Sequence, residues 1–124
     1  SNAGLPPHSE HQDDQVQTIQ AWSHEHYKES TSLGQLAEMV TLSPRQLQRR
    51  FTTTLGEPPL QDLQRVRIEA ARKMLERGTN NLARLSEQVG YQDVSSFSRL
   101  FKRHTGLSPS HYRQRFSRTG TRSA

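Results

Sequence analysis

Two short stretches of the sequence place basic, amide and hydroxyl side chains at helical spacing, on faces that are separate from the apolar positions. These side chains belong to Arg45, Gln48 and Arg49 in the first stretch, and to Ser96 and Arg99 in the second. An arginine can donate two parallel hydrogen bonds to guanine, and the amide of glutamine can pair in the same way with adenine. The chemistry that these residue types favour is therefore the reading of base edges in duplex DNA.

Further polar residues flank these positions and extend the same two surfaces. Those that we predict as additional DNA contacts are Gln46, Ser95, Lys102, Arg103 and Gln92. Lys102 and Gln92 suit a phosphate better than a base. For each arginine, a phosphate contact without sequence preference is the alternative to base reading.

Each stretch follows a short amphipathic helix and a tight turn, which is the order of elements in a helix-turn-helix motif. In the second stretch the apolar positions are Leu82, Leu85, Val89, Phe97, Leu100 and Phe101, with the turn at Gly90 and the second helix starting near Ser95. The first stretch repeats this pattern. Leu33, Leu36 and Val40 correspond to Leu82, Leu85 and Val89 at an offset of 49 residues, whereas Leu47, Arg49, Phe51, Gly56 and Pro59 correspond to Phe97, Arg99, Phe101, Gly106 and Pro109 at an offset of 50. The sequence therefore predicts two helix-turn-helix units, with one residue inserted in the second turn.

Local signals set the expected ends of the helices. A serine followed by a proline marks helix starts at Pro44 and Pro109, and Gly56 marks a helix end. We expect a first helix capped by Asp13 or Asp14, and a long linker helix over 59–77, which would measure about 28 Å. The apolar positions that we expect in the core include Val16, Ile19, Leu47, Phe51, Leu55, Leu60, Leu63, Ala71, Leu75, Tyr112 and Phe116.

These elements predict an all-α fold of about seven helices, in which two helix-turn-helix subdomains are joined by a long linker helix. The expected divisions are 1–12 for a tag remnant and linker, 13–56 for the first subdomain, 57–78 for the linker helix, 79–116 for the second subdomain and 117–124 for a disordered tail.

The two units and the helix between them together resemble the DNA-binding domain of the AraC/XylS family of bacterial transcription regulators, over roughly 33–115. The resemblance rests on Leu36-Ala37, Leu42-Ser43, Leu47-Gln48-Arg49, Phe51, Arg67-Ile68, Ala71, Leu75, Val89-Gly90-Tyr91, Asp93, Ser95, Phe97, Arg99-Leu100-Phe101, Gly106, Ser108-Pro109 and Tyr112-Arg113. Ser86 departs from the family pattern, which usually has alanine there, and Asp62 stands where an aromatic residue is common. Both departures concern packing rather than DNA contact.

The charge distribution agrees with a polyanionic partner. Residues 1–40 hold one lysine against six acidic residues, a net charge of −5, whereas residues 41–124 hold 16 basic against six acidic residues, a net charge of +10. The basic part is the part that contains both units, which favours a surface facing nucleic acid. Well-solvated arginine-rich helices are the alternative explanation of the charge alone.

Several other classes of function find no support in the sequence. There is no cysteine, so neither a disulfide nor a thiolate metal site can form. His24 and His26 lie on different faces of a helix and have no evident acidic partner, so we expect no metal and no cofactor. No catalytic constellation, membrane span or signal peptide is evident, and we expect a cytoplasmic protein that is not an enzyme.

The function expected from these residues is sequence-specific binding of double-stranded DNA by a transcription regulator, with two recognition helices in successive segments of the major groove. The resemblance implies RNA polymerase as a further partner, and an effector or dimerisation domain upstream of this chain. The alternative is a helical protein-interaction module that contacts RNA polymerase or a regulatory domain without reading bases. Such a module would be expected to expose apolar or aromatic anchors on the same helices.

Overall fold

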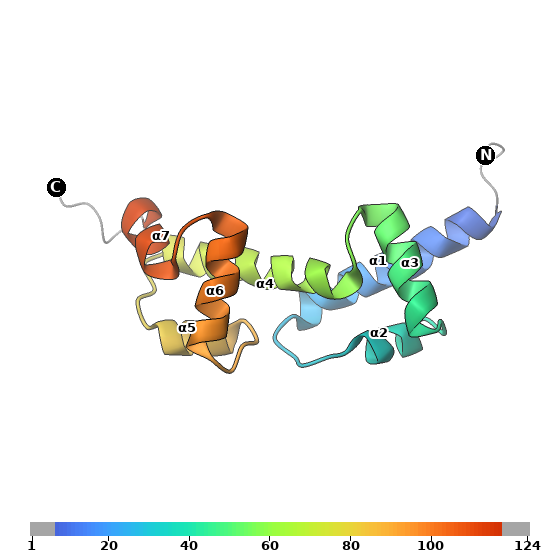
Figure 1. The fold of residues 1–124 in the computed structure, drawn as a ribbon, viewed down its shortest axis with the longest axis horizontal. Coiled ribbons are helices and arrows are strands. Elements are labelled where there is room, and N and C mark those ends of the chain that lie inside the picture. Colours follow the sequence, from blue (N-terminus) through green and yellow to red (C-terminus); the bar gives the residue numbers. More distant parts are fainter. Residues whose placement is uncertain (1–6, 118–124) are drawn as a thin grey trace. The chain divides into compact units, whose positions relative to one another are not determined.

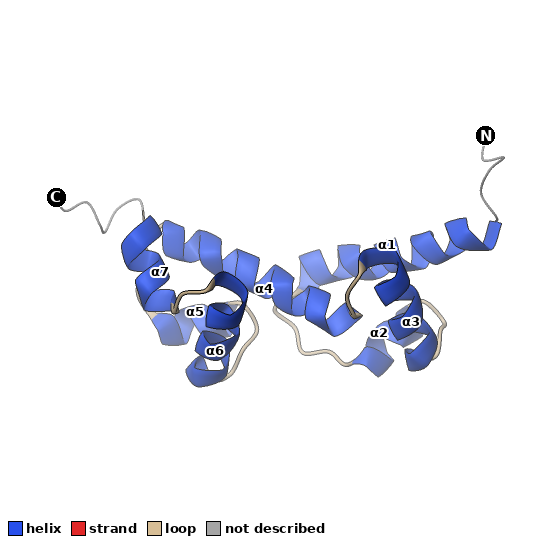
Figure 2. Ribbon diagram, turned by 45° about the horizontal axis from the view of Figure 1, so that its top comes forward, coloured by secondary structure: helices blue, strands red, loops and turns tan. Residues whose placement is uncertain are grey.

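Seven helices make up the part of the chain that the computed structural model describes, which is residues 7–117, with side chains from Asp14 onward. They are α1 (Pro7–His26), α2 (Leu33–Met39), α3 (Pro44–Leu55), α4 (Pro59–Glu76), α5 (Leu82–Gln88), α6 (Val94–Thr105) and α7 (Pro109–Phe116). No strand occurs between residues 7 and 117 (Figure 2). The expected all-α fold with two helix-turn-helix subdomains is confirmed.

The helices form two units, each with its own core. Among the described residues, unit 1 contains 7–26 and Ser30–Gln64, and unit 2 contains Tyr27–Glu29 and 65–117 (Figure 1). Helix α4 spans both units, since its residues up to Gln64 belong to unit 1 and those from Arg65 belong to unit 2. The expected division of the chain into 13–56, 57–78 and 79–116 stays a prediction.

In unit 1, α1 supports a helix-turn-helix made of α2 and α3. Its core consists of Val16, Ile19, Leu36, Ala37, Val40, Leu47 and Phe51. Phe51 and Leu47 lie on one face of α3 and are fully buried, which fixes the opposite face of α3 toward solvent.

In unit 2, α4 has the role that α1 has in unit 1, and α5 and α6 form the helix-turn-helix. Its core consists of Ile68, Ala71, Leu75, Leu85, Val89, Phe97, Phe101 and Tyr112. The aromatic side chains make a continuous series, since the ring centroids of Phe97 and Phe101 are 5.8 Å apart and those of Phe101 and Tyr112 are 5.4 Å apart. Helix α7 closes this core through Tyr112.

The repeat extends to the supporting helices, which the sequence comparison missed. Val16, Ile19 and Ser23 of α1 correspond to Ile68, Ala71 and Leu75 of α4 at an offset of 52 residues, and all six are buried. Each unit thus contains the same arrangement of three helices, α1 to α3 in unit 1 and α4 to α6 in unit 2. The offset is hidden in the sequence because the residue types differ and the serine breaks the apolar pattern.

The local signals located most helix ends. The N-cap residues are Ser32, Ser43, Asn81, Asp93 and Ser108, each accepting a hydrogen bond from a backbone amide of the first turn. Gly56 and Gly106 end α3 and α6 in the left-handed conformation, with φ of 85° and 87°. The starts at Pro44 and Pro109 are confirmed, and α6 begins at Val94, one residue before the expected position.

Two expected boundaries are wrong. Helix α1 begins at Pro7 rather than near Asp13, so part of the expected 1–12 linker is helical. Proline is well accommodated in the first turn of a helix, and the residues that follow need no apolar stripe to be helical. Ser117 belongs to the ordered chain rather than to the tail, because it is buried and caps α7. The expected tag remnant at 1–3 and the remaining tail at 118–124 lie outside the described residues.

Three residues that we expected in the core are exposed instead. Leu55 is 38% exposed, Leu60 38% and Phe116 48%. Each lies in the first or last turn of its helix. At these helix ends, a position on the apolar stripe does not lead to burial.

Candidate nucleic-acid interface

Helix α3 presents a line of exposed polar residues, which we call the α3 stripe: Arg45, Gln48, Arg49 and Thr52. Their spacing of three and four residues places them along one side of the helix. Fully buried Leu47 and Phe51 hold the other side in the core of unit 1. The three residues that we predicted to contact bases from this helix therefore share one solvent-facing surface.

A shallow groove of about 510 Å³ accompanies the α3 stripe. All four stripe residues line it, together with Leu33, Pro44 and Thr53. Leu33 is the first residue of α2, so the groove runs from α3 to the start of the preceding helix. The groove combines hydrogen-bond donors with the apolar side chains of Leu33 and Pro44. Such a surface can contact both the polar edges and the methyl groups of bases.

The start of α3 uses one of the predicted DNA contacts. The Ser43 hydroxyl accepts a hydrogen bond from the Gln46 amide at 3.1 Å, and the Ser43 amide donates to Oε1 of Gln46 at 3.0 Å. This reciprocal capping box satisfies two amides at the helix start. Gln46 is half-buried and its Oε1 is engaged in the cap, while its contact with DNA stays a prediction.

Helix α6 presents a second line of exposed residues, which we call the α6 stripe: Ser95, Arg99, Lys102 and Arg103. Phe97 and Phe101 bury the opposite face. Compared with α3, the long cationic side chains lie nearer the C-terminal end of the helix. Gln92 is exposed in the turn that precedes α6.

The start of α6 is held by Asp93. Its carboxylate accepts a hydrogen bond from the Ser96 hydroxyl at 2.7 Å and one from the Ser95 amide at 3.1 Å. These hydrogen bonds, with that of Ser96 the largest cause, hold the pKa of Asp93 below its usual value, and the charge of Arg99 adds to the effect. The hydroxyl of Ser96, which we predicted to contact a base, is thus engaged with the cap.

Counted from the caps, the two recognition helices correspond at an offset of 50 residues. Gln46 and Ser96 then occupy the same position, and both bond to the cap residue. Gln48 corresponds to Ser98, a half-buried residue that the sequence analysis did not select. The offset of 50 was already evident from the repeat, so extending it to every polar position would have identified Ser98.

The turn between α2 and α3 is tied to α1. The side-chain nitrogen Nε2 of Gln15 donates to the carbonyl oxygen of Val40 at 3.0 Å, and Arg50 donates to Oε1 of Gln15 at 2.7 Å. Arg50 is half-buried beside the core rather than on the α3 stripe. One side chain of α1 therefore contacts both the end of α2 and the side of α3.

The turn between α5 and α6 is tied to α4 in a related way. Arg67 donates to the carbonyl oxygens of Tyr27 at 2.6 Å and Glu29 at 2.9 Å, and its guanidinium carbon lies 5.1 Å from the ring centroid of Tyr91. Burial raises the pKa of Tyr91, while Arg67 opposes that shift. Gly90 allows this close approach, since a Cβ atom there would lie 2.9 Å from both Arg67 Nε and the Tyr27 oxygen.

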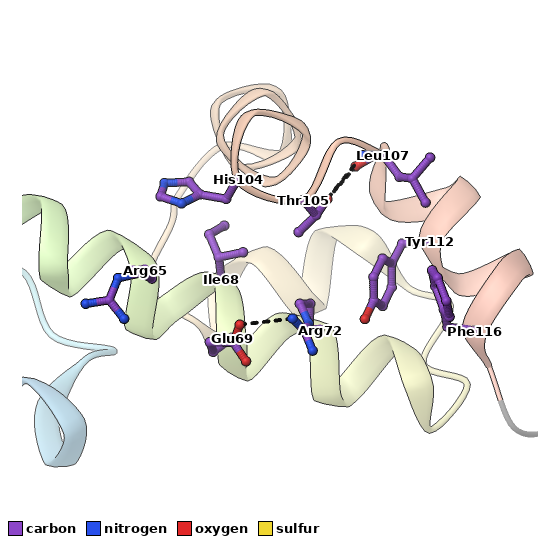
Figure 3. Close-up of a pocket in the computed structure, with 9 residues that line it drawn as sticks. All are labelled: Arg65, Ile68, Glu69, Arg72, His104, Thr105, Leu107, Tyr112 and Phe116. Atoms are coloured by element: carbon purple, nitrogen blue, oxygen red, sulfur yellow. Dashed lines mark hydrogen bonds and ion pairs between the residues drawn. The ribbon is translucent and has the colours of Figure 1, made fainter.

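A different groove of unit 2, also about 510 Å³, lies between α4, the end of α6 and α7 (Figure 3). Tyr112 donates to the Glu76 carboxylate at 2.6 Å, and Arg72 bonds to Glu69 at 3.1 Å, so side chains at this groove also pair with each other. Burial, followed by the hydrogen bond to Glu76, raises the pKa of Tyr112. Phe116 contributes an exposed apolar edge.

Between residues 14 and 117, where side chains are described, no group of three histidine or acidic side chains is placed to hold a metal ion. The ring nitrogen Nδ1 of His24 lies 3.0 Å from the carbonyl oxygen of Gln20, within its own helix. No helix in this part of the chain is long and apolar enough to cross a membrane.

Comparison with known proteins agrees with this geometry. Residues 36–115 match the model of a family described as a helix-turn-helix domain. A putative AraC-like transcription regulator of Streptomyces lividans is 39% identical over 85 residues, which are 68% of this chain and 28% of that protein. The chain belongs to the AraC/XylS family of transcription regulators.

Solved structures of similar AraC-type domains share its fold. The C-terminal domain of AraT, a response regulator from Geobacillus stearothermophilus, has a TM-score of 0.81 at 26% identity, over 95% of this chain and 93% of that one. The DNA-binding domain of AdpA, a global transcriptional factor whose structure contains a target DNA, has a TM-score of 0.77 at 29% identity, over 82% of this chain and 91% of that one. The present chain is thus an AraC-type helix-turn-helix DNA-binding domain.

The chain spans about a third of the length of the first curated relatives that it matches, between 28% and 33%.

Both departures from the AraC/XylS pattern are accommodated in this domain. Ser86 is buried, and its hydroxyl donates to the Ala83 carbonyl at 3.0 Å. Asp62 is buried in the first turn of α4, where the helix dipole favours a negative charge.

Proposed function

We propose that this AraC-type domain binds duplex DNA sequence-specifically, with α3 and α6 in successive segments of the major groove, and thereby controls transcription. The observation that carries the proposal is that each recognition helix buries one face completely and exposes a stripe of hydrogen-bond donors on the other. The similarity to the DNA-bound domain of AdpA supports it. Helix α4 has 18 residues and is about 27 Å long, which is comparable to the spacing of about 34 Å between major-groove faces.

Within this proposal the stripes have unequal roles. Arg45, Gln48 and Arg49 read bases from α3, and Arg99 is the main base-reading residue of α6, with Ser95 and Ser96 at its start. Gln46 and Arg103 are further candidates for base contact, whereas Lys102 and Gln92 contact phosphates. Because residues near the N-terminal end of a recognition helix reach the base edges, cations near its C-terminal end lie closer to the backbone of the DNA.

The test is selection from a pool of random DNA duplexes, followed by sequencing, at a low and a high salt concentration. We expect a site of two blocks about one helical turn apart, with an affinity that falls steeply as salt increases, because phosphate contacts release counterions. A single enriched block would mean that one unit reads bases and the other only binds phosphate. Salt-sensitive binding to every duplex without enrichment would refute sequence-specific recognition.

The remaining partners belong to the whole regulator. We propose that the domain acts in the cytoplasm on chromosomal DNA, and that the full-length protein carries an N-terminal effector or dimerisation domain and contacts RNA polymerase. That the chain spans about a third of its curated relatives supports a further domain.

The alternative, a helical interaction module without base reading, predicts apolar anchors on the exposed faces of α3 and α6. The two stripes hold only polar and basic residues, and therefore favour DNA. A chain that binds no duplex at either salt concentration would favour the alternative.

A further inference from the structure

Each supporting helix directs one polar side chain toward the turn of its own unit. Gln15 of α1 and Arg67 of α4 are equivalent residues, because both precede by one position the first member of the buried series that matches at an offset of 52. Both are half-buried, and neither belongs to the α3 stripe or the α6 stripe. Gln15 and Arg67 thus occupy equivalent positions although their residue types differ, which indicates the same structural role in both units.

In unit 1 the contact fixes the end of α2. Val40 is the C-cap of α2, and the last carbonyls of a helix have no partner within the helix. Gln15 supplies a donor to the Val40 carbonyl at 3.0 Å and simultaneously accepts from Arg50 of α3 at 2.7 Å. The amide of Gln15 therefore links the elements before and after the turn through one rigid group.

In unit 2 the contact fixes the residues around Gly90. Arg67 bonds to the backbone of Tyr27 and Glu29 and lies against the Tyr91 ring. The Tyr91 ring in turn lies 5.9 Å from the ring of Phe97, which is buried on the inner face of α6. A continuous series of contacts thus connects Arg67 to the N-terminal turn of the recognition helix.

We propose that Gln15 and Arg67 are positioning residues for base reading, each of which sets the orientation of the recognition helix of its own unit without contacting DNA. The inference rests on the proposed function. Its physical basis is that base reading requires donors to be held within a fraction of an ångström, so a turn that loosens without unfolding weakens discrimination. A purely stabilising role would instead lower the melting temperature and leave the affinity of the folded protein unchanged.

Two substitutions isolate these contacts. Gln15→Glu keeps an acceptor for Arg50 but removes the donor to the Val40 carbonyl. Arg67→Met keeps a long apolar stem and removes all the donors. Gln17→Glu and Lys73→Met are matched controls, since they make similar chemical changes at exposed positions of α1 and α4.

The binding experiment uses the full chain and three duplexes: the selected two-block site, and the same site with either block scrambled. The loss of preference caused by Arg49→Ala assigns one block to unit 1. On the intact site each test variant should bind about tenfold more weakly, a loss similar to that of one mismatched base pair. The loss for Gln15→Glu should disappear when the unit 1 block is scrambled, and the loss for Arg67→Met when the unit 2 block is scrambled.

Measurements are made at a temperature at which circular dichroism shows each variant to be fully folded. Amide exchange should be faster at 41–43 in Gln15→Glu and at 90–92 in Arg67→Met, while the controls resemble the wild type. Losses that are equal on all three duplexes, or affinities that do not change, would overturn this inference alone. A wild-type chain without preference for either block would overturn the proposed function as well.

Discussion

Substitution of Gly90 by alanine tests the close packing at the turn before α6. Gly90 has a φ of 104°, and a Cβ atom added there would lie 2.9 Å from the Tyr27 carbonyl oxygen and 2.9 Å from Arg67 Nε. Gly106 in the same unit has a φ of 87° but nothing within 4 Å of an added Cβ. Alanine at either position would therefore suffer the same conformational strain, but only alanine at position 90 would also collide with neighbouring atoms.

The expected magnitudes follow from these two contributions. Left-handed backbone costs an L-residue about 1–2 kcal/mol, which is the full expected loss for Gly106→Ala. For Gly90→Ala the Tyr27 carbonyl or Arg67 must also move, which breaks a charge-assisted hydrogen bond worth about 1.5–3 kcal/mol. The free energy of unfolding of unit 2 should therefore fall by about 2.5–5 kcal/mol in Gly90→Ala.

Native-state hydrogen exchange is the suitable assay, because it reports the stability of unit 2 without assuming that both units unfold together. The amides of Phe97 and Phe101 in the core of α6 provide the readout. The reasoning is refuted if Gly90→Ala lowers their protection no more than Gly106→Ala does.

Three further outcomes are expected from the recognition helices and α7. Arg49→Ala and Arg99→Ala should each cost about 1–3 kcal/mol of binding free energy on the selected site and less on random DNA; an equal loss on both would assign these arginines to phosphate. The pKa of Asp93 is lowered by its hydrogen bonds with Ser96 and Ser95, so its contribution to stability is present above its usual value and lost as the pH falls below it. Melting temperatures of wild type between pH 5 and 3 should accordingly fall more steeply than those of Asp93→Asn, and parallel curves would contradict the role of the cap. The pKa of Tyr112 is raised by burial and by the bond to Glu76, so its contribution is present below its usual value of 10.0 and lost as the pH rises through the raised pKa. Alkaline denaturation followed by circular dichroism should show a larger loss in the wild type than in Tyr112→Phe, in which the raised pKa of Tyr91 still contributes.

The sequence predicted the fold well wherever a local signal determines it. The Ser43-Pro44 and Ser108-Pro109 pairs began helices as expected, and Gly56 ended one. These signals act within one turn of helix, through an amide that needs a partner or a φ that only glycine adopts easily. Exposure at helix ends was harder to predict: Leu55 and Phe116 continue an apolar stripe, yet each is the last residue of its helix and is exposed.

The composition of the candidate interface was also predictable, but the support behind it was not. Arg45, Gln48 and Arg49 are exposed together as expected, because helical periodicity separates them from the buried face. The contacts of Gln15 and Arg67 span 25 and 40 residues. No local pattern specifies such a partner, since it depends on how the supporting helix packs.

The inserted residue of the second unit can be located from the hydrogen bonds of the two turns. The Leu42 amide donates to the Ala37 carbonyl, and the Tyr91 amide donates to the Ser86 carbonyl. The two turns therefore correspond at an offset of 49 residues as far as Leu42 and Tyr91. The caps Ser43 and Asp93 already differ by 50, which identifies Gln92 as the extra residue. An exposed turn position tolerates such an insertion.

Because Gln92 is the extra residue, the base-reading positions of α3 and α6 correspond when they are counted from the N-cap residues Ser43 and Asp93. At the offset of 50, Arg49 and Arg99 are identical and exposed, whereas Arg45 corresponds to Ser95 and Thr52 to Lys102. One shared arginine in an otherwise different stripe predicts two blocks that have one base pair in common and differ elsewhere. Alignment of the blocks from the selected sites tests this directly: identical blocks would show that the differing residues do not contribute to base reading.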